Sequence, residues 1–153
     1  MFMKLLMLHG VNHNMFGYRD PALYGHATYE QINESLMKVA EELGVELEIF
    51  QTNYEGAFVE KIHEAFFNKT DAIVINPGGW TNYCIGVADA LRILTVPIVE
   101  IHMSNIFTKH GGTARGETSA VATGVVIGLG IHSYEMGLRA AVALAKDRQA
   151  EQA

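Results

Sequence analysis

Short apolar runs alternate with helical patterns along this chain, and this alternation limits the folds open to it. Five segments are expected to form strands: residues 5–8, 45–50, 72–75, 98–101 and 121–127. Residues 5–8 and 72–75 are continuously apolar, which is typical of strands buried on both faces of a parallel sheet. Helical spacing of apolar residues marks four further segments, residues 28–43, 58–66, 85–94 and 134–142. The alternation indicates strand–helix–strand units.

Local signals fix the ends of the first helix and the place of the second strand. Thr28 and Gln31 form a capping box, and Gly44 is the expected C-terminal stop. Residues 45–50 alternate apolar and acidic, which places that strand nearer the edge of the sheet. We therefore expect a flavodoxin-like, doubly wound fold of class α/β. It would have a five-stranded parallel sheet, right-handed crossovers and helices on both faces.

The length of 153 residues fits one domain with a single core. Hydrophobic residues make up 49% of the chain and charged residues 18%, so a sizeable core can form. We assign residues 1–146 to this domain and expect residues 147–153 to form a solvated C-terminal tail.

Charge and cysteine content exclude several classes of partner. The net charge of −6 leaves no basic stripe for nucleic acid or for an anionic membrane surface. The longest apolar stretch, residues 121–131, is far too short to span a bilayer. The single cysteine, Cys84, rules out an internal disulfide framework and suits the reducing cytoplasm. A small-molecule substrate is the remaining expectation.

Ligands of doubly wound sheets bind beyond the carboxyl ends of the strands, which directs attention to Glu100 and His102. Residues two apart on a strand face the same way, so the carboxylate can accept from one imidazole nitrogen. The other nitrogen is then free to act as an acid or a base. A polar strand cap is the simpler alternative.

Three further groups lie at the same edge. The turn at Met103 and Ser104 offers backbone N–H groups that can hold a carboxylate, unless it is an ordinary capped turn. Asn76 brings an amide to the end of a strand, before glycines that permit close approach of a ligand. Tyr24 follows Arg19 in a long loop, where a guanidinium would favour the phenolate form of the tyrosine. Otherwise, the tyrosine anchors the loop.

The seven histidines do not form a convincing set of metal ligands. His9 and His13 lie four residues apart but in a loop without a nearby carboxylate. Cys84 has no obvious base partner and is expected to be a buried small residue. We therefore expect neither a metal nor a cofactor.

Taken together, these segments resemble the type II 3-dehydroquinate dehydratases, or type II dehydroquinases. The order and spacing of the matching stretches are specific, although no single stretch is decisive. They are residues 10–14, 17–25, 50–56, 62–65, 75–81, 89–91, 97–105 and 123–130. The resemblance implies a cofactor-free hydro-lyase that removes water from 3-dehydroquinate through an enolate. It also implies trimers that assemble into dodecamers.

The resemblance implies a role for each matching residue. Tyr24 would take the proton next to the ketone, assisted by Arg19, and Asn12 would help hold a water at the enolate oxygen. His102, oriented by Glu100, would protonate the departing hydroxyl. The remaining roles concern the substrate and the neighbouring subunit. Asn76 and the backbone of Met103 and Ser104 would bind substrate, and Asp89 would reach a neighbouring subunit's site.

The chain departs from the family pattern at recognition positions. His9 replaces the first asparagine of the opening motif, and Asn82 stands where the family has a histidine. Lys109 and Thr113 occupy the places of two arginines, although Arg115 could supply a guanidinium from nearby. A lysine replaces the charge of an arginine but not its planar fork.

Three hypotheses follow from this mixture. The first is a working, divergent dehydroquinase that forms 3-dehydroshikimate. The second is a paralogue that uses the same acid–base site on another hydroxy-ketone or cyclic acid, as Asn82 and Thr113 suggest. The third is a non-catalytic binding module of the same fold, for which a paired acid and base would be superfluous.

Overall fold

A computed structural model describes residues 2–109 and 116–153 and contains a single five-stranded parallel sheet. The strand order is β2-β1-β3-β4-β5, which is the flavodoxin-like order. The strands are β1 (Lys4–His9), β2 (Glu46–Gln51), β3 (Ala72–Asn76), β4 (Ile98–His102) and β5 (Gly124–Ile127). The predicted fold is confirmed, and β2 lies at an edge, as its alternating sequence indicates.

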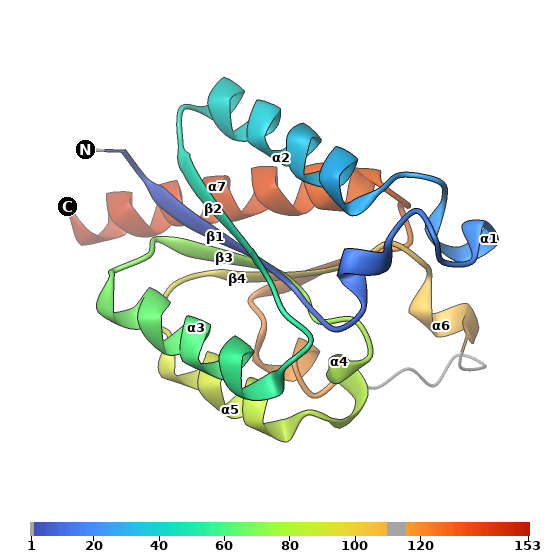
Figure 1. Cartoon of the computed structure of the whole chain (residues 1–153). Coiled ribbons are helices and arrows are strands. Elements are labelled where there is room, and N and C mark those ends of the chain that lie inside the picture. The colour runs from blue at the N-terminus through green and yellow to red at the C-terminus, as the bar shows by residue number, and fades with distance from the viewer. Residues whose placement is uncertain (1, 110–115) are drawn as a thin grey trace.

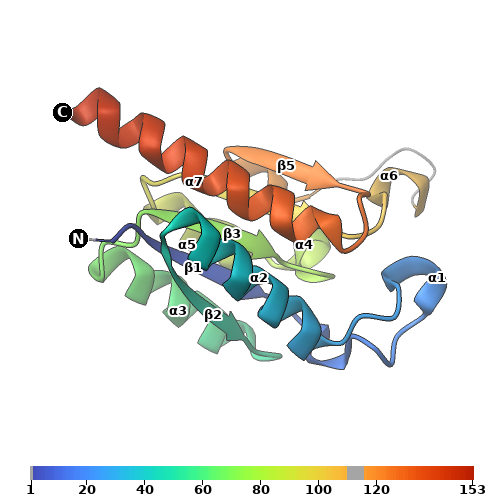
Figure 2. The same cartoon turned by 90° about the horizontal axis from the view of Figure 1, so that it is seen from above.

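Long helices cover both faces of the sheet (Figures 1 and 2). One face carries α2 (Tyr29–Leu43) and α7 (His132–Gln152), and the other carries α3 (Glu55–Phe67) and α5 (Ile85–Ile93). The short elements are η1 (His13–Met15), α1 (Pro21–Tyr24), α4 (Trp80–Tyr83), α6 (Ile106–Lys109) and η2 (Ser119–Val121). In Figure 1, α1, α4 and α6 gather at the end of the sheet opposite the two termini.

The predicted start and stop of α2 are both present. The Thr28 hydroxyl accepts from the Gln31 backbone N–H, and the Gln31 side chain accepts from the Thr28 backbone N–H. Gly44 ends the helix in the left-handed region, at φ 67°. These interactions satisfy helix-end groups that would otherwise lack a partner.

Alternate residues of each central strand enter two separate cores. Leu5 and Met7 of β1 pack beneath α2 and α7, whereas Leu6 and Leu8 pack against α3 and α5. All five residues of β3 are buried, which explains its continuously apolar sequence. The same alternation directs the polar residues at the strand ends toward one face or the other.

The structure differs from the sequence-based expectations in three places. The last strand begins at Gly124 rather than at residue 121, because residues 119–121 form a 3-10 helix. Phe66, the last apolar residue of the segment with helical spacing, is 47% exposed, since Phe58, Ile62 and Ala65 already fill the buried side of α3. Residues 147–152, expected in a solvated tail, are mostly exposed but continue α7 as a helix.

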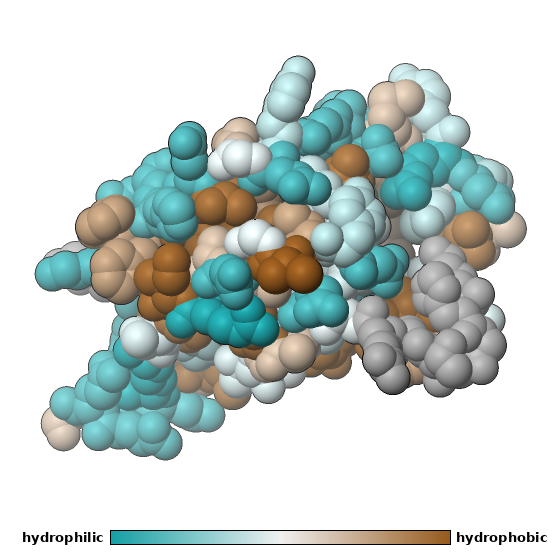
Figure 3. Space-filling model, turned by 90° about the horizontal axis from the view of Figure 1, so that it is seen from below, coloured by the Kyte–Doolittle hydropathy of each residue, from teal (hydrophilic) through white to brown (hydrophobic). Residues whose placement is uncertain are grey.

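Several large apolar side chains remain exposed on the side of the molecule that α3 and α5 cover. Phe67 is 77% exposed, Ile85 61% and Ile93 48%. Figure 3 views this side and shows apolar groups among polar ones. Over the described ranges of the chain, no helix is both long enough and apolar enough to cross a membrane.

Gly137 lets α7 approach β4 closely. A Cβ atom at this position would lie only 2.4 Å from Cγ2 of Ile101. We predict that Gly137→Val lowers the free energy of unfolding by about 1–3 kcal/mol, because the extra methyl groups overpack the core. Urea denaturation would measure this loss.

Gly86 offers a matched control, because a Cβ there would meet no atom within 4 Å. Gly86→Ala should raise the free energy of unfolding by up to about 1 kcal/mol through helix propensity. Equal effects of the two substitutions would contradict the packing argument.

Candidate active site

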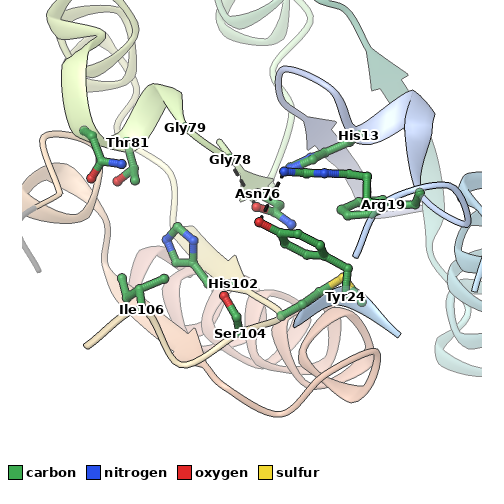
Figure 4. A pocket seen from close by; sticks show the side chains of 13 residues that line it. His13, Arg19, Tyr24, Asn76, Gly78, Gly79, Thr81, His102, Ser104 and Ile106 are labelled. Carbon is green, nitrogen blue, oxygen red and sulfur yellow. Dashed lines mark hydrogen bonds between the residues drawn. The ribbon is translucent and has the colours of Figure 1, made fainter. Parts of the chain in front are cut away.

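A cavity of about 250 Å³ opens at the carboxyl ends of β3 and β4, beside the loop that follows β1 (Figure 4). It is lined by His13, Phe16, Arg19, Tyr24, Asn76, Gly78, Gly79, Thr81, Asn82, His102, Met103, Ser104 and Ile106. The chain leaves β1 toward β2 on one side and returns as β3 on the other. The cavity therefore lies at the point where the strand order reverses, which is where doubly wound sheets bind ligands.

Tyr24 and Arg19 contact each other at one side of the cavity. Nη2 of Arg19 donates to the Tyr24 hydroxyl at 3.2 Å, and the guanidinium carbon lies 4.0 Å from the centre of the tyrosine ring. Asp20 caps the short helix α1 by accepting from Ala22 N–H, which fixes the turn that carries Tyr24. The guanidinium thus places a positive charge beside the phenolic oxygen.

Glu100 and His102 lie on the same face of β4, as their spacing predicts. The carboxylate is fully buried and the imidazole is 6% exposed. Nε2 of His102 lies 3.1 Å from Oε2 of Glu100, although the two atoms are not aligned as a hydrogen bond. The other imidazole nitrogen, Nδ1, is the one left for a ligand in the cavity.

Hydroxyl groups that the sequence did not reveal surround the Glu100 carboxylate. Thr118 and Ser119 each donate to one of its two oxygens. The Thr118 hydroxyl also lies 2.9 Å from the hydroxyl of Thr81. Because Thr118 has one hydroxyl proton and gives it to the carboxylate, Thr81 must be the donor in that contact. Through Thr118, the network connects Thr81 of the cavity wall to Glu100, which faces His102.

Asn76 is held in one orientation by two partners. Its Oδ1 accepts from Gly78 N–H at 3.2 Å, and its Nδ2 donates to the hydroxyl of Tyr134 at 2.9 Å. Burial raises the pKa of Tyr134 far above its ordinary value. The remaining N–H of the amide can donate to a ligand. In the sequence, Tyr134 only marks the start of the last helical segment, and nothing near it points to Asn76.

His9 and His13, expected in one loop, lie at the end of β1 and in η1, and both are buried. Nε2 of His9 lies 2.8 Å from Oδ1 of Asn33, and burial lowers the pKa of His9 to about 4. Burial also lowers the pKa of His13 well below its usual range. Both rings are therefore neutral near pH 7. Within residues 2–109 and 116–153, no group of three or more His, Cys, Asp or Glu side chains could hold a metal ion.

The other predicted site residues divide between the cavity and the surface. Met103, Ser104 and Asn82 line the cavity. Asn12 is exposed at the start of η1, and its backbone N–H donates to Asn53 rather than facing the cavity. Asp89 is also exposed and pairs with Arg92 on α5. The remaining predictions, Thr113, Arg115 and the Lys109 side chain, lie outside the described residues.

Comparison with known proteins gives one consistent family. The chain matches the family model for dehydroquinase class II over residues 3–142. A 3-dehydroquinate dehydratase from Syntrophotalea carbinolica is 49% identical over 143 residues, which cover 94% of this chain and 97% of the relative. A 3-dehydroquinate dehydratase from Leptothrix cholodnii is 48% identical over 142 residues, with 93% and 95% covered.

A solved structure gives the same result in three dimensions. The type II dehydroquinase from Propionibacterium acnes matches with a TM-score of 0.87 at 36% identity. The match covers 93% of this chain and 98% of that one.

His9 should make stability depend on pH. In the unfolded chain its imidazole titrates near 6.5, whereas in the folded chain it titrates near 4. Between these values the unfolded chain binds more protons, so the free energy of unfolding falls as the pH falls. We predict that His9→Asn removes about 3 kcal/mol of this loss between pH 6.5 and 4.

Urea denaturation at several pH values would measure the slope. His13 contributes with the same sign, so part of the dependence should remain in the variant. His63→Asn, at an exposed position of α3, is the control and should keep the wild-type slope. An unchanged slope in His9→Asn would contradict the assignment.

Proposed function

This chain belongs to the class II dehydroquinase family, and we propose that it is a hydro-lyase that removes water from 3-dehydroquinate to give 3-dehydroshikimate. The observation that carries the proposal is the content of the cavity. A tyrosine in contact with an arginine and a histidine beside a buried glutamate face the same space. The names of the relatives favour this reading over a paralogue with another substrate and over a non-catalytic module.

The reaction begins at Tyr24. In its phenolate form, this residue takes the proton from the carbon next to the ketone, and the electrons of the C–H bond move onto the ketone oxygen to form an enolate. Arg19 stabilises the phenolate, since its guanidinium both donates to the oxygen and stacks on the ring. The reaction needs no cofactor, because an acid and a base suffice for each step.

His102 completes the elimination. As the enolate re-forms the ketone, the C–O bond to the hydroxyl breaks, and His102 donates a proton so that water leaves. Glu100 positions the imidazole from the buried side of β4, and the hydroxyls of Thr118 and Ser119 hold the carboxylate in place. The proton gained by Tyr24 and the one lost by His102 balance, and solvent restores both groups.

Substrate binding uses groups around this pair. Backbone N–H groups at Met103 and Ser104 hold the substrate carboxylate, and the free N–H of Asn76 contacts the ring. Asn82 lines the same cavity and takes a recognition role. Thr113 is assigned to recognition by family resemblance alone. The proposed role of Asn12, holding a water at the enolate oxygen, receives no support from its exposed position.

The assembly proposed for this chain is the trimer-based dodecamer of the family, in the cytoplasm. The exposed apolar side chains on the α3 and α5 side support it, because assembly would remove them from water. Asp89 and Ile85 lie one helical turn apart on α5, and both are exposed. The exposure of Asp89 supports a contact with a second copy rather than with its own cavity.

Solution measurements test this assembly. Sedimentation should give a multiple of the 16.8 kDa chain mass, twelvefold for the dodecamer. Ile85→Lys should shift the population toward smaller species, because it places a charge in the proposed interface. Met37→Lys, on the opposite helical layer in α2, serves as a control with a similarly exposed apolar residue. A monomer at all concentrations would contradict the proposal.

Turnover tests the reaction directly. We predict that purified protein with 3-dehydroquinate produces the enone absorbance of the product. Tyr24→Phe and His102→Ala should each lower kcat by roughly 10²- to 10⁴-fold, the usual contribution of general acid–base catalysis. His63→Ala, on the exposed side of α3, should leave the rate unchanged.

A wild-type rate no higher than that of Tyr24→Phe and His102→Ala would contradict the proposed reaction. A screen of related hydroxy-ketones and cyclic acids would then test the alternative substrate. If that screen also gave no turnover, the binding-module hypothesis would gain support.

A further inference from the structure

His13 is a buried part of the cavity wall that the proposed mechanism does not use. Its side chain is 2% exposed and belongs to η1, directly after β1. One face of the ring stacks on Phe16, with centroids 4.7 Å apart. The edge-on contact with His9, at 6.2 Å, fixes the ring from another side. These two contacts hold the ring in one position.

The backbone determines which nitrogen of His13 carries the proton. The N–H of Gly10 is shared between the carbonyl of Asn76, at 2.8 Å, and Nδ1 of His13, at 3.1 Å. Nδ1 must accept the hydrogen bond from Gly10, because a proton on Nδ1 would be repelled by the amide proton. Burial, with a smaller contribution from the positive charge of Arg19, lowers the pKa of His13, so the ring stays neutral. The single ring proton then resides on Nε2.

This Nε2–H donor lies at the glycine-rich side of the cavity. A Cβ atom on Gly78 would come within 2.8 Å of Nε2, so the donor lies against a wall that bears no side chain. Among residues 2–109 and 116–153, Nε2 of His13 makes no hydrogen bond, and it is not one of the fully buried polar atoms. Because His13 lines the cavity, a ligand there can accept from this nitrogen. Figure 4 shows His13 at the same side of the cavity as Arg19 and Tyr24.

We propose that His13 is a further catalytic residue, whose Nε2–H donates to the ketone oxygen of the substrate and to the enolate oxygen that forms from it. The inference rests on the proposed function, because that oxygen gains charge only when Tyr24 takes the adjacent proton. A fixed donor aimed at developing charge stabilises the transition state more than the ground state. A neutral imidazole is also a weak acid, so it stabilises the enolate without protonating it.

The position of Asn12 supports the same assignment. Family resemblance gives Asn12 the task of holding a water at the enolate oxygen. Here its side chain lies outside the cavity lining, while the next residue along the chain is buried in it. The left-handed backbone of Asn12, at φ 67°, starts η1 and places His13 on the cavity side. His13 thus offers a direct donor to the enolate oxygen, where the family resemblance leads us to expect a water held by Asn12.

Substitution kinetics give the first test. His13→Phe keeps an aromatic ring for stacking on Phe16 but removes the donor, and kcat should fall by about 10²-fold with little change in KM. His13→Gln places an amide N–H near the position of Nε2 and should recover part of the rate. His63→Phe, at an exposed position, is the control. Thermal unfolding would establish that each variant is folded.

Binding gives a second test that is independent of turnover. Calorimetry would compare 3-dehydroshikimate with an analogue that lacks the ketone oxygen. The wild type should bind the first roughly tenfold more tightly, and His13→Phe should bind the two equally.

The outcomes separate this inference from the proposed function. An inactive wild type would overturn both. An active wild type with an equally active His13→Phe would overturn only the role of His13. If His13→Phe were slow yet still discriminated between the two ligands as the wild type does, His13 would be a packing residue and the inference would be wrong.

Discussion

The burial of the Glu100 carboxylate determines how the rest of this active site is built. A charged group that no solvent reaches needs hydrogen bonds from the protein, and Thr118 and Ser119 supply them. To bring these hydroxyls over β4, the chain forms η2 and delays the start of β5 to Gly124. Thr81 then links the same network to the turn after β3. The catalytic pair therefore depends on three separate segments that meet only in the folded chain.

The other side of the cavity is built from neutral groups in the same manner. Asn76 is oriented by Tyr134 of α7, and His13 by the N–H of Gly10. In each case the partner decides which atom donates and which accepts before any ligand arrives. Such preorganisation matters for an enolate, because donors that need not reorient cost nothing at the moment of reaction. The close approach of α7 to β4 at Gly137 places Tyr134 within reach of the sheet.

Sequence alone predicted the fold because its signals are local. Apolar runs, the Thr28 capping box and Gly44 each specify their element through near neighbours, and the Glu100–His102 pair follows from strand spacing. Partners far apart in the sequence were missed. Asn76 and Tyr134 are 58 residues apart, and Thr118 looks like an ordinary loop threonine. His13 was weighed only as a metal ligand, since the burial that makes it neutral is a property of the tertiary structure.

Glu100 and His102, proposed for proton transfer, differ in burial from Asn82, proposed for substrate recognition. Glu100 and His102 are buried and interlocked, so a substitution there would leave a charged or polar partner without compensation. Asn82, by contrast, is exposed and lines the cavity, so its replacement leaves no buried charged group without a partner. Changes at such positions can alter affinity for ring substituents while the acid and the base keep their geometry. Retention of the reaction therefore constrains the sequence more tightly than retention of every recognition contact.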